Sequence, residues 1–393
     1  MRYGFKDVVI DSRTGLNPRK NFALGNGENN YITIKDIFNG QINITDKTDK
    51  VDDEAIQIIK KRSRIKVGDI LFVSIGRIGE TAIVENKDDT WDVNESVFVF
   101  TINREIITPE YFCTLFQSDA VQKYLAGNSS GSTFKSIKMN QLEKMVFDLP
   151  PLEIQDNITA RLSKIKAICA QRSSELTCLD KLIKARFVET FGDPKLNPHC
   201  YPVQQLSKHI QFLTSGSRGW SEYCVDSGRE WFITIKNVKD CHISIDNMQP
   251  INVPCNAEAK RTRVQEGDLL ISITADLGRT GVVSKEIADH GAYINQHLTC
   301  IRLNRDVLEP LYVAYYMESP AGKEQIISKN QSAVKAGLNF NSINSLQVFV
   351  PPLSIQKEFV GFVLKIERIK NSIESSIIKM KMLYDSLMQG YFR

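Results

Sequence analysis

The sequence contains a long internal repeat, and this feature limits the possible folds of the chain more than any other. When the 393 residues are displaced by 201 positions, identical segments coincide in the same order over most of the length. Around residue 70 the displacement is 199, which indicates small insertions in surface loops, where they are best tolerated. A period near 200 is too long for a solenoid and predicts a duplicated domain. The matching segments include Ile32–Lys35 with Ile233–Lys236, Gly68–Asp69 with Gly267–Asp268, Asn103–Arg104 with Asn304–Arg305, and Pro150–Leu152 with Pro351–Leu353.

Each half changes its pattern at a Pro-Pro pair. Before the pair, short β-branched runs alternate with Gly and Asn, which is typical of strands. A helical pattern separates the last two of these runs, so we expect a mixed α/β (α+β) domain in each half. The predicted strands are 31–37, 69–75, 96–102 and 145–149 in the first half and 231–238, 268–274, 297–303 and 346–350 in the second, and the predicted helices are 109–124 and 309–328.

After each Pro-Pro pair, apolar residues recur in steps of three and four. A period of 3.5 residues over four heptads is typical of a coiled coil. A helix of ~40 residues spans ~60 Å, more than packing against its own domain requires, so we expect the two helices to pair with each other rather than to lie singly on a domain. The predicted seam consists of Ile158, Leu162, Ile165, Leu176, Leu179 and Ile183 in the first helix and Phe359, Val363, Ile366, Ile373, Ile377 and Met380 in the second.

These patterns divide the chain into four parts. Two domains, 1–149 and 194–349, are each followed by a long helix, 150–193 and 350–393. The first helix is expected to end at Gly192, because a glycine followed by Pro194 is a common helix stop. No apolar run approaches the ~18 residues of a membrane span, and the N-terminus lacks a stretch of signal-peptide type. We therefore expect a cytoplasmic protein that does not enter a membrane.

The sequence offers no recognisable catalytic or metal site. It contains no G-x-x-x-x-G-K-[ST] loop, and its five histidines have no metal-ligand spacing. The glycines at 25–27 and 76–79 lack the full dinucleotide fingerprint and are interpreted as turn residues. We therefore predict no catalytic residues and no metal ligands, although an unfamiliar active site stays open.

Basic and amide side chains near glycine-containing loops are the candidates for contact with DNA. Lys and Arg neutralise phosphates, Arg reads guanine, and Gln reads adenine. The net charge of +4 permits such a patch without requiring it, and each side chain can equally be an ordinary surface charge. Lys35 and Lys236 are favoured because the repeat superimposes them. The candidates are Arg13, Arg19, Lys20, Lys35, Arg77, Lys135 and Lys138 in the first domain and Arg218, Lys236, Arg279, Gln296 and Lys335 in the second.

The order of the motifs in this sequence resembles the order found in the specificity subunits of type I restriction-modification systems. The resemblance is carried by Gly-Asp-Ile-Leu at 68–71, Gly-Asp-Leu-Leu at 267–270, and the Pro-Pro-Leu-x-Ile-Gln junctions within 149–155 and 350–356, each opening a long helix. It covers essentially the whole chain. Asn94-Glu95 departs from the more family-like Asn295-Gln296 of the second half.

This resemblance implies a specific role. Two target-recognition domains would each read one half of a bipartite, asymmetric site in double-stranded DNA. The spacer helices would form an antiparallel coiled coil around a pseudo-two-fold axis and set the gap between the half-sites. The chain would have no catalysis and bind no cofactor. It would dock methyltransferase subunits, expected to be two, and through them restriction and translocase subunits, which would carry S-adenosylmethionine, ATP and Mg.

Two other interpretations stay open from the sequence. One is the recognition subunit of another restriction system, whose partner is a fused nuclease-methyltransferase. The other is a coiled-coil scaffold with duplicated binding domains that does not bind DNA.

Overall fold

The computed structural model describes residues 1–19, 21–131, 134–274, 276–329 and 337–392. The chain divides into two compact units. Unit 1 contains Met1–Ser173 and Glu374–Arg393, and unit 2 contains Ser174–Ile373. Each long helix therefore begins in one unit and ends in the other. Among the described residues, no helix combines the length and the apolar character needed to cross a bilayer.

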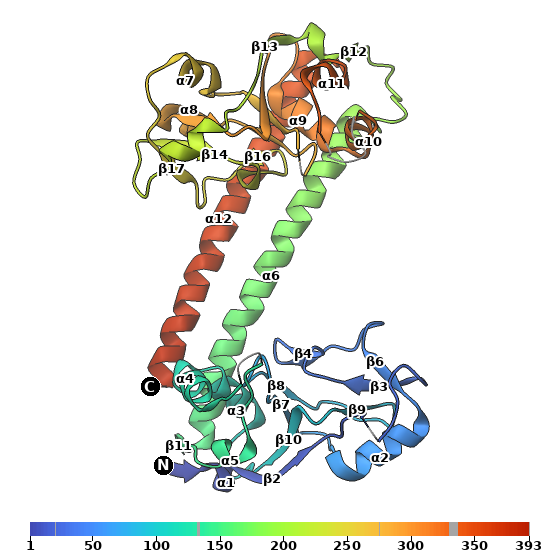
Figure 1. Ribbon diagram of the computed structural model, residues 1–393, viewed down its shortest axis with the longest axis vertical. Helices are drawn as coiled ribbons and strands as arrows, with labels where there is room; N and C mark the ends of the chain where they lie inside the picture. The colour runs from blue at the N-terminus through green and yellow to red at the C-terminus, as the bar shows by residue number, and fades with distance from the viewer. Residues whose placement is uncertain (20, 132–133, 275, 330–336, 393) are drawn as a thin grey trace. The chain divides into compact units, whose positions relative to one another are not determined.

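Unit 1 has two larger sheets (Figure 1) and two two-stranded ones, β1-β11 and β4-β5. An antiparallel four-stranded sheet has the order β2-β10-β7-β8, and a three-stranded sheet has the order β6-β3-β9, in which β3 and β9 run parallel. The strands are β1 (Arg2–Gly4), β2 (Val9–Thr14), β3 (Asn29–Ile32), β4 (Ile37–Phe38), β5 (Gln41–Ile42), β6 (Asp49–Val51), β7 (Ile70–Val73), β8 (Thr81–Ile83), β9 (Trp91–Val93), β10 (Val97–Ile102) and β11 (Val146–Asp148), and the helices before the spacer are α1 (Phe5–Val8), α2 (Asp53–Ser63), α3 (Pro109–Phe116), α4 (Asp119–Asn128) and α5 (Met139–Leu142).

Unit 2 repeats this plan. Its four-stranded sheet has the order β13-β21-β18-β19 and its three-stranded sheet the order β17-β14-β20, again with the last pair parallel. The strands are β12 (Val203–Gln205), β13 (Ile210–Ser215), β14 (Glu230–Ile233), β15 (Val238–Lys239), β16 (His242–Ile243), β17 (Gln249–Ile251), β18 (Leu269–Ser272), β19 (Thr280–Val282), β20 (Ala292–Ile294), β21 (Leu298–Leu303) and β22 (Gln347–Phe349), and the helices are η1 (Leu206–Lys208), η2 (Gly219–Tyr223), η3 (Ile235–Asn237), α7 (Ala257–Thr262), α8 (Lys285–His290), α9 (Pro310–Glu318), α10 (Pro320–Ser328) and α11 (Phe340–Asn344).

The matching sheet orders show that the sequence repeat is a duplicated mixed α/β fold. Helix α8 has no counterpart in the elements described for unit 1, and it lies where the displacement returns from 199 to 201. Its outer residues Lys285 and Glu286 are exposed. The extra residues in this part of the second half thus form a short surface helix rather than a longer loop.

The helical segments 109–124 and 309–328 differ from the prediction, because each contains two helices. Ser118 caps the second helix in unit 1 by accepting a hydrogen bond from the Val121 amide at 3.5 Å. Ser319 does the same for Gly322 in unit 2 at 3.2 Å, and Pro320 occupies the first position of α10. A serine that caps a new helix, with or without proline, ends the preceding one because its backbone is extended.

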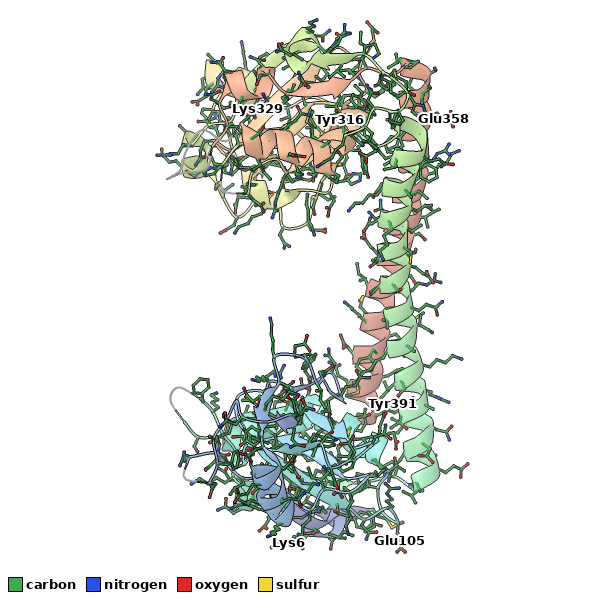
Figure 2. The ribbon with its side chains drawn as sticks, turned by 90° about the vertical axis from the view of Figure 1, so that its right-hand side faces the viewer. Lys6, Glu105, Tyr316, Lys329, Glu358 and Tyr391 are labelled. Atoms are coloured by element: carbon green, nitrogen blue, oxygen red, sulfur yellow. The ribbon has the colours of Figure 1, made fainter. Side chains whose placement is uncertain are left out.

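The spacer helices are α6 (Leu152–Phe191) and α12 (Leu353–Tyr391). Helix α6 ends before Gly192, whose φ of +77° suits glycine. In unit 1, Arg161 donates to the Tyr391 hydroxyl at 3.4 Å and Lys166 lies over the Tyr384 ring. Figure 2 labels Tyr391, the last residue of α12. Residue numbers rise along α6 as they fall along α12, so the helices are antiparallel there.

Unit 2 contains the same antiparallel pairing. Arg186 forms an ion pair with Glu358 at 3.0 Å, and Asp180 forms one with Lys370 at 2.8 Å. All twelve predicted seam residues are buried or half-buried, whereas Leu182, outside the seam, is 47% exposed. Those in unit 1 are Ile158, Leu162, Ile165, Ile377 and Met380, and those in unit 2 are Leu176, Leu179, Ile183, Phe359, Val363, Ile366 and Ile373.

A charged cluster interrupts the apolar seam in unit 2. Lys370 lies between Asp180 and Glu367, and Glu367 also contacts the His242 ring at 3.1 Å. Burial by itself lowers the pKa of Lys370, but its two carboxylate partners outweigh this and raise it. Burial likewise raises the pKa of Glu367, yet His242 and Lys370 bring the pKa below its ordinary value. The cluster joins β16 to both helices, and the contacts within it favour the charged forms of Lys370 and Glu367.

The last residue of the Pro-Pro-Leu-x-Ile-Gln junction fastens each domain to its spacer helix. Gln356 is fully buried; its Oε1 accepts from the Glu309 amide, and its Nε2 donates to the carbonyls of Val307 and Pro351. Gln155 makes the same three hydrogen bonds in unit 1, at 2.8–3.0 Å. This explains the repeated motif, because a glutamine amide supplies both the acceptor and the donors that these backbone groups need.

Candidate nucleic-acid interface

The aspartate of each Gly-Asp motif is a structural residue inside its domain. Asp69 accepts a hydrogen bond from the Lys66 amide at 2.8 Å and forms an ion pair with Arg13 of β2 at 3.0 Å. Asp268 accepts from the Gln265 amide at 2.7 Å, but its guanidinium partner is Arg302 of β21. Both carboxylates are buried, and each is therefore paired with a cation from another strand of the same sheet.

Arg13 is consequently removed from the candidates for DNA contact. Arg13 is only 6% exposed. Its guanidinium forms an ion pair with Asp69 and donates hydrogen bonds to the Thr101 hydroxyl and the Arg64 carbonyl. Sequence alone did not reveal this, because the buried partner lies more than fifty residues away in the chain. Arg13 balances a buried charge and does not face a ligand.

Four segments of unit 1 are joined into one edge, which we call turn edge 1: residues 33–36, 74–80, 94–96 and 134–138. The Ser74 amide donates to the Ser96 carbonyl, and the Ile137 amide donates to the Ser74 carbonyl. The Asn94 amide donates to the carbonyl of Ile32, which immediately precedes the first segment. Backbone hydrogen bonds thus bring together predicted candidates that are a hundred residues apart: Lys35, Arg77, Lys135 and Lys138.

These four candidates differ in how freely they face the solvent. Lys35 is paired with Asp49 at 2.9 Å. Arg77 donates to the carbonyls of Ile34 and Ile37 and lies over the Phe38 ring, so its guanidinium is held in place. Lys135 and Lys138 are exposed, and no ion pair is found for either within the described residues. Arg19 is exposed on a separate loop, with a φ of +26°, and Lys20 lies outside the described residues.

Unit 2 has an equivalent turn edge 2, formed by residues 234–237, 272–274, 276–279, 295–297 and 337–338. The Ile273 amide donates to the His297 carbonyl, and the Leu338 amide donates to the Ile273 carbonyl. Lys236 is exposed here, and Gln296 contacts the His297 ring at 3.0 Å. Arg218 is exposed at the start of η2, and Lys335 lies outside the described residues.

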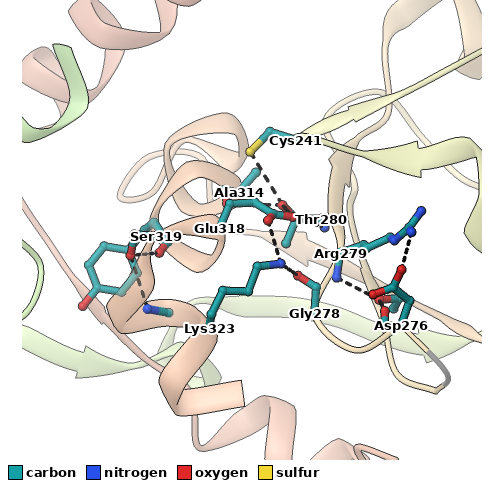
Figure 3. A network of polar contacts seen from close by, with 12 residues as sticks. Cys241, Asp276, Gly278, Arg279, Thr280, Ala314, Glu318, Ser319 and Lys323 are labelled. Atoms are coloured by element: carbon teal, nitrogen blue, oxygen red, sulfur yellow. Dashed lines mark hydrogen bonds and ion pairs between the residues drawn. The ribbon is translucent and has the colours of Figure 1, made fainter. Parts of the chain in front are cut away.

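Arg279 belongs to a turn that is anchored on the helices behind it (Figure 3). It forms an ion pair with Asp276. The Thr280 amide donates to Glu318 of α9 at 2.8 Å, and Lys323 of α10 donates to the Gly278 carbonyl at 2.7 Å. The displacement of 199 aligns Asp276 with Arg77 and Arg279 with Glu80, so the two edges carry opposite charges at equivalent positions.

Asn94 and Asn295 shape the turns that carry their neighbours. The Asn94 Oδ1 accepts from the Ser96 amide at 3.0 Å, and the Asn295 Oδ1 accepts from the His297 amide at 3.1 Å. The side-chain oxygen of each asparagine is therefore used inside the turn. The residues that follow them differ between the two halves of the chain. These residues, Glu95 and Gln296, are half-buried at the two edges.

Sequence reasoning missed two exposed residues near the edges. Arg62 donates to the Thr14 hydroxyl at 3.2 Å, and Phe134 on turn edge 1 is 71% exposed. The repeat could have indicated Arg62, since it aligns with Arg261, which occupies a similar place beside β13. Within the described residues, no group of three or more His, Cys, Asp or Glu side chains is arranged to hold a metal ion.

Known proteins share both the sequence and the fold. The family model described as the type I restriction modification DNA specificity domain matches residues 5–177 and 251–380. A Methanocaldococcus jannaschii protein, provisionally named the MjaX type I restriction enzyme specificity subunit, is 25% identical over 373 residues, covering 90% of this chain and 83% of that protein.

Two solved structures resemble the fold across its length. One, from work on complex assembly and conformational transition of the type I R-M system, has a TM-score of 0.62 and 19% identity and covers 100% of this chain and 97% of that chain. The other, the type I S subunit from M. genitalium, has a TM-score of 0.58 and 13% identity, with 99% and 94% covered. Because the family model matches well over half of the sequence, this chain belongs to the type I restriction-modification DNA specificity family.

Proposed function

We propose that the chain reads a bipartite, asymmetric site in double-stranded DNA, with turn edge 1 on one half-site and turn edge 2 on the other. Family membership gives it a sequence-recognition role without catalysis of its own. The observation that supports two different half-sites is the divergence of the duplicated edges: Glu95 aligns with Gln296, and Arg77 with Asp276. A carboxylate accepts from cytosine, whereas glutamine pairs with adenine.

The same proposal defines the partners. Methyltransferase and restriction subunits belong to a type I system, and we propose two methyltransferase subunits, because the chain contains its fold twice. S-adenosylmethionine, ATP and Mg would be bound by those partners. Since the target is genomic DNA, we place the chain in the cytoplasm.

A reconstituted system tests this function. The purified chain alone should neither methylate nor cut DNA, and adding the partner methyltransferase with S-adenosylmethionine should produce methylation at one bipartite sequence. Comparing the methylated bases of the host genome with and without the gene identifies that sequence. Methyl transfer by the isolated, homogeneous chain would refute the assignment, as would a methylation pattern that does not depend on the gene.

A matched pair of lysine variants tests the assignment of the edges. Lys138→Ala removes an exposed cation from turn edge 1, and Lys181→Ala removes one from α6. Loss of one phosphate contact should reduce the salt dependence of DNA binding by about 0.9 in the logarithmic slope. Only Lys138→Ala should show this change. Equal effects of the two variants would contradict the placement of the interface at the edge.

A further inference from the structure

The loop that follows α4 presents an aromatic ring to the solvent. Phe134 is 71% exposed, although large aromatic side chains are normally among the most buried in a protein. Its described neighbours are small or polar: Ser130 and Gly131 before it, and Lys135 and Ser136 after it. The described residues next to Phe134 in its loop therefore add no apolar side chain to the ring.

The loop is fastened at its base, so the exposure of the ring is a property of the fold. Ser130 and Ser136 exchange two backbone hydrogen bonds of 2.9 and 2.8 Å, which close the loop. The Gly76 amide then donates to the Lys135 carbonyl at 3.0 Å, which holds the residue beside Phe134 against the turn between β7 and β8. Phe134 thus stands on turn edge 1, in a loop whose backbone is hydrogen-bonded to Gly76, the residue before Arg77.

The charges in the segment that contains Phe134 favour an anionic partner. From residue 120 to residue 142 the sequence contains three lysines, Lys123, Lys135 and Lys138, and no Asp or Glu. Lys135 and Lys138 are exposed close to the ring. An exposed aromatic ring in a segment that carries lysines and no Asp or Glu is suited to nucleic acid, since the lysines meet phosphates while the ring stacks on bases.

The second domain lacks this ring. The bridge between Ile75 and Ser136 corresponds to the bridge between Thr274 and Gly337, which fixes the displacement at 201 in this loop. At that displacement the residue aligned with Phe134 is Lys335. The duplicated domains therefore differ at a position where side-chain chemistry decides between stacking on a base and contacting a phosphate.

We propose that Phe134 inserts between two base pairs of the first half-site and unstacks that step, as apolar wedges do in other DNA-bending proteins. This inference rests on the proposed function, because it needs turn edge 1 to face DNA. The insertion would make binding depend on how easily the base step unstacks, because the deformability of base steps differs with sequence. The second half-site receives no wedge from the equivalent position.

The test uses the full chain assembled with its methyltransferase and duplexes that carry 2-aminopurine at successive adenines of the first half-site. This base fluoresces more strongly when it is unstacked. Apart from the target adenine, which a methyltransferase flips out of the stack, wild type should increase the fluorescence at one step. Phe134→Ala should abolish that increase and weaken binding by about 5- to 100-fold. Phe134→Trp should restore both. The salt dependence of binding should not change in Phe134→Ala, because no phosphate contact is lost.

Lys135→Ala is the matched control, and it should lower the salt dependence while leaving the fluorescence increase in place. An unchanged fluorescence increase in Phe134→Ala, with wild-type binding, would overturn the proposal. Failure of Phe134→Ala to copurify with the methyltransferase would also overturn it, because the ring would then be a protein contact. If the wild-type complex itself showed no sequence-specific methylation, the proposed function would fail instead.

Discussion

Replacing Gln356 tests how the second recognition domain is fastened to its spacer helix. The side chain is fully buried and makes three hydrogen bonds of 2.8–2.9 Å, to the Glu309 amide and the carbonyls of Val307 and Pro351. At about 1 kcal/mol for each hydrogen bond, Gln356→Leu should lower the free energy of unfolding by about 3 kcal/mol. The loss should be larger if the three backbone groups find no water, because buried groups without partners cost about 1–3 kcal/mol each.

Gln356→Glu keeps the shape and makes the effect depend on pH. One carboxylate oxygen would still accept from Glu309, but the other would face two carbonyl oxygens without a proton. The folded state should therefore raise the pKa of this carboxyl above the unfolded value of about 4.3. Between these two pKa values the deficit grows by about 1.4 kcal/mol per pH unit as pH rises. The variant should thus be closer to wild type at pH 5 than at pH 8.

Urea denaturation at the two pH values measures these differences, and hydrogen exchange of the segment 306–312 reports the local contact. Gln211→Glu, at an exposed position of β13, is the control and should change little at either pH. The deficit of Gln356→Leu should be the same at pH 5 and pH 8. A deficit of Gln356→Glu that is also independent of pH would refute the reasoning, since the carbonyls would then not face the new carboxylate.

Three further predictions concern the spacer helices. Inserting one heptad at Ser173–Ser174 and one at Ser375–Ser376 lengthens each helix by about 10 Å, so mapped methylation sites should keep their half-sites and widen the gap by about 3 base pairs; an unchanged gap would show that the helices do not set it. Residues 1–193 alone should form a homodimer by sedimentation and, with the methyltransferase, modify a palindrome of the first half-site, whereas a monomer at micromolar concentration would contradict pairing through the seam. Because the folded state lowers the pKa of Glu367, its stabilising contribution is present above the unfolded pKa of about 4.3 and is lost as pH falls through the folded pKa. The thermal unfolding midpoint of Glu367→Gln should therefore lie furthest below that of wild type near pH 7, and the two midpoints should converge toward pH 3. A difference between the midpoints that does not change with pH would argue against the charged cluster.

The features that depend on periodicity and repetition could be predicted from the sequence. The displacement of about 201 residues predicted two copies of one fold, and the 3.5-residue period predicted both long helices and their seam. Such patterns can be recognised in a single sequence because each reflects a contact that recurs at a fixed spacing, as along one helix face. Ser118 and Ser319 each cap the start of a second helix. This local signal was present in the sequence, but the continuous helical pattern led to the prediction of one helix in each half.

Which charged and polar residues face outward became clear only from the folded chain. Arg13 and Arg77 are both arginines near turns, yet Arg13 neutralises the buried Asp69 while Arg77 stands on turn edge 1. In unit 2 the corresponding Asp268 takes its cation from Arg302, on a different strand, so even the repeat could not predict the partner. The physical reason is that a side chain's role depends on burial and on partners brought together by sheet pairing, and these contacts join residues that no local spacing relates.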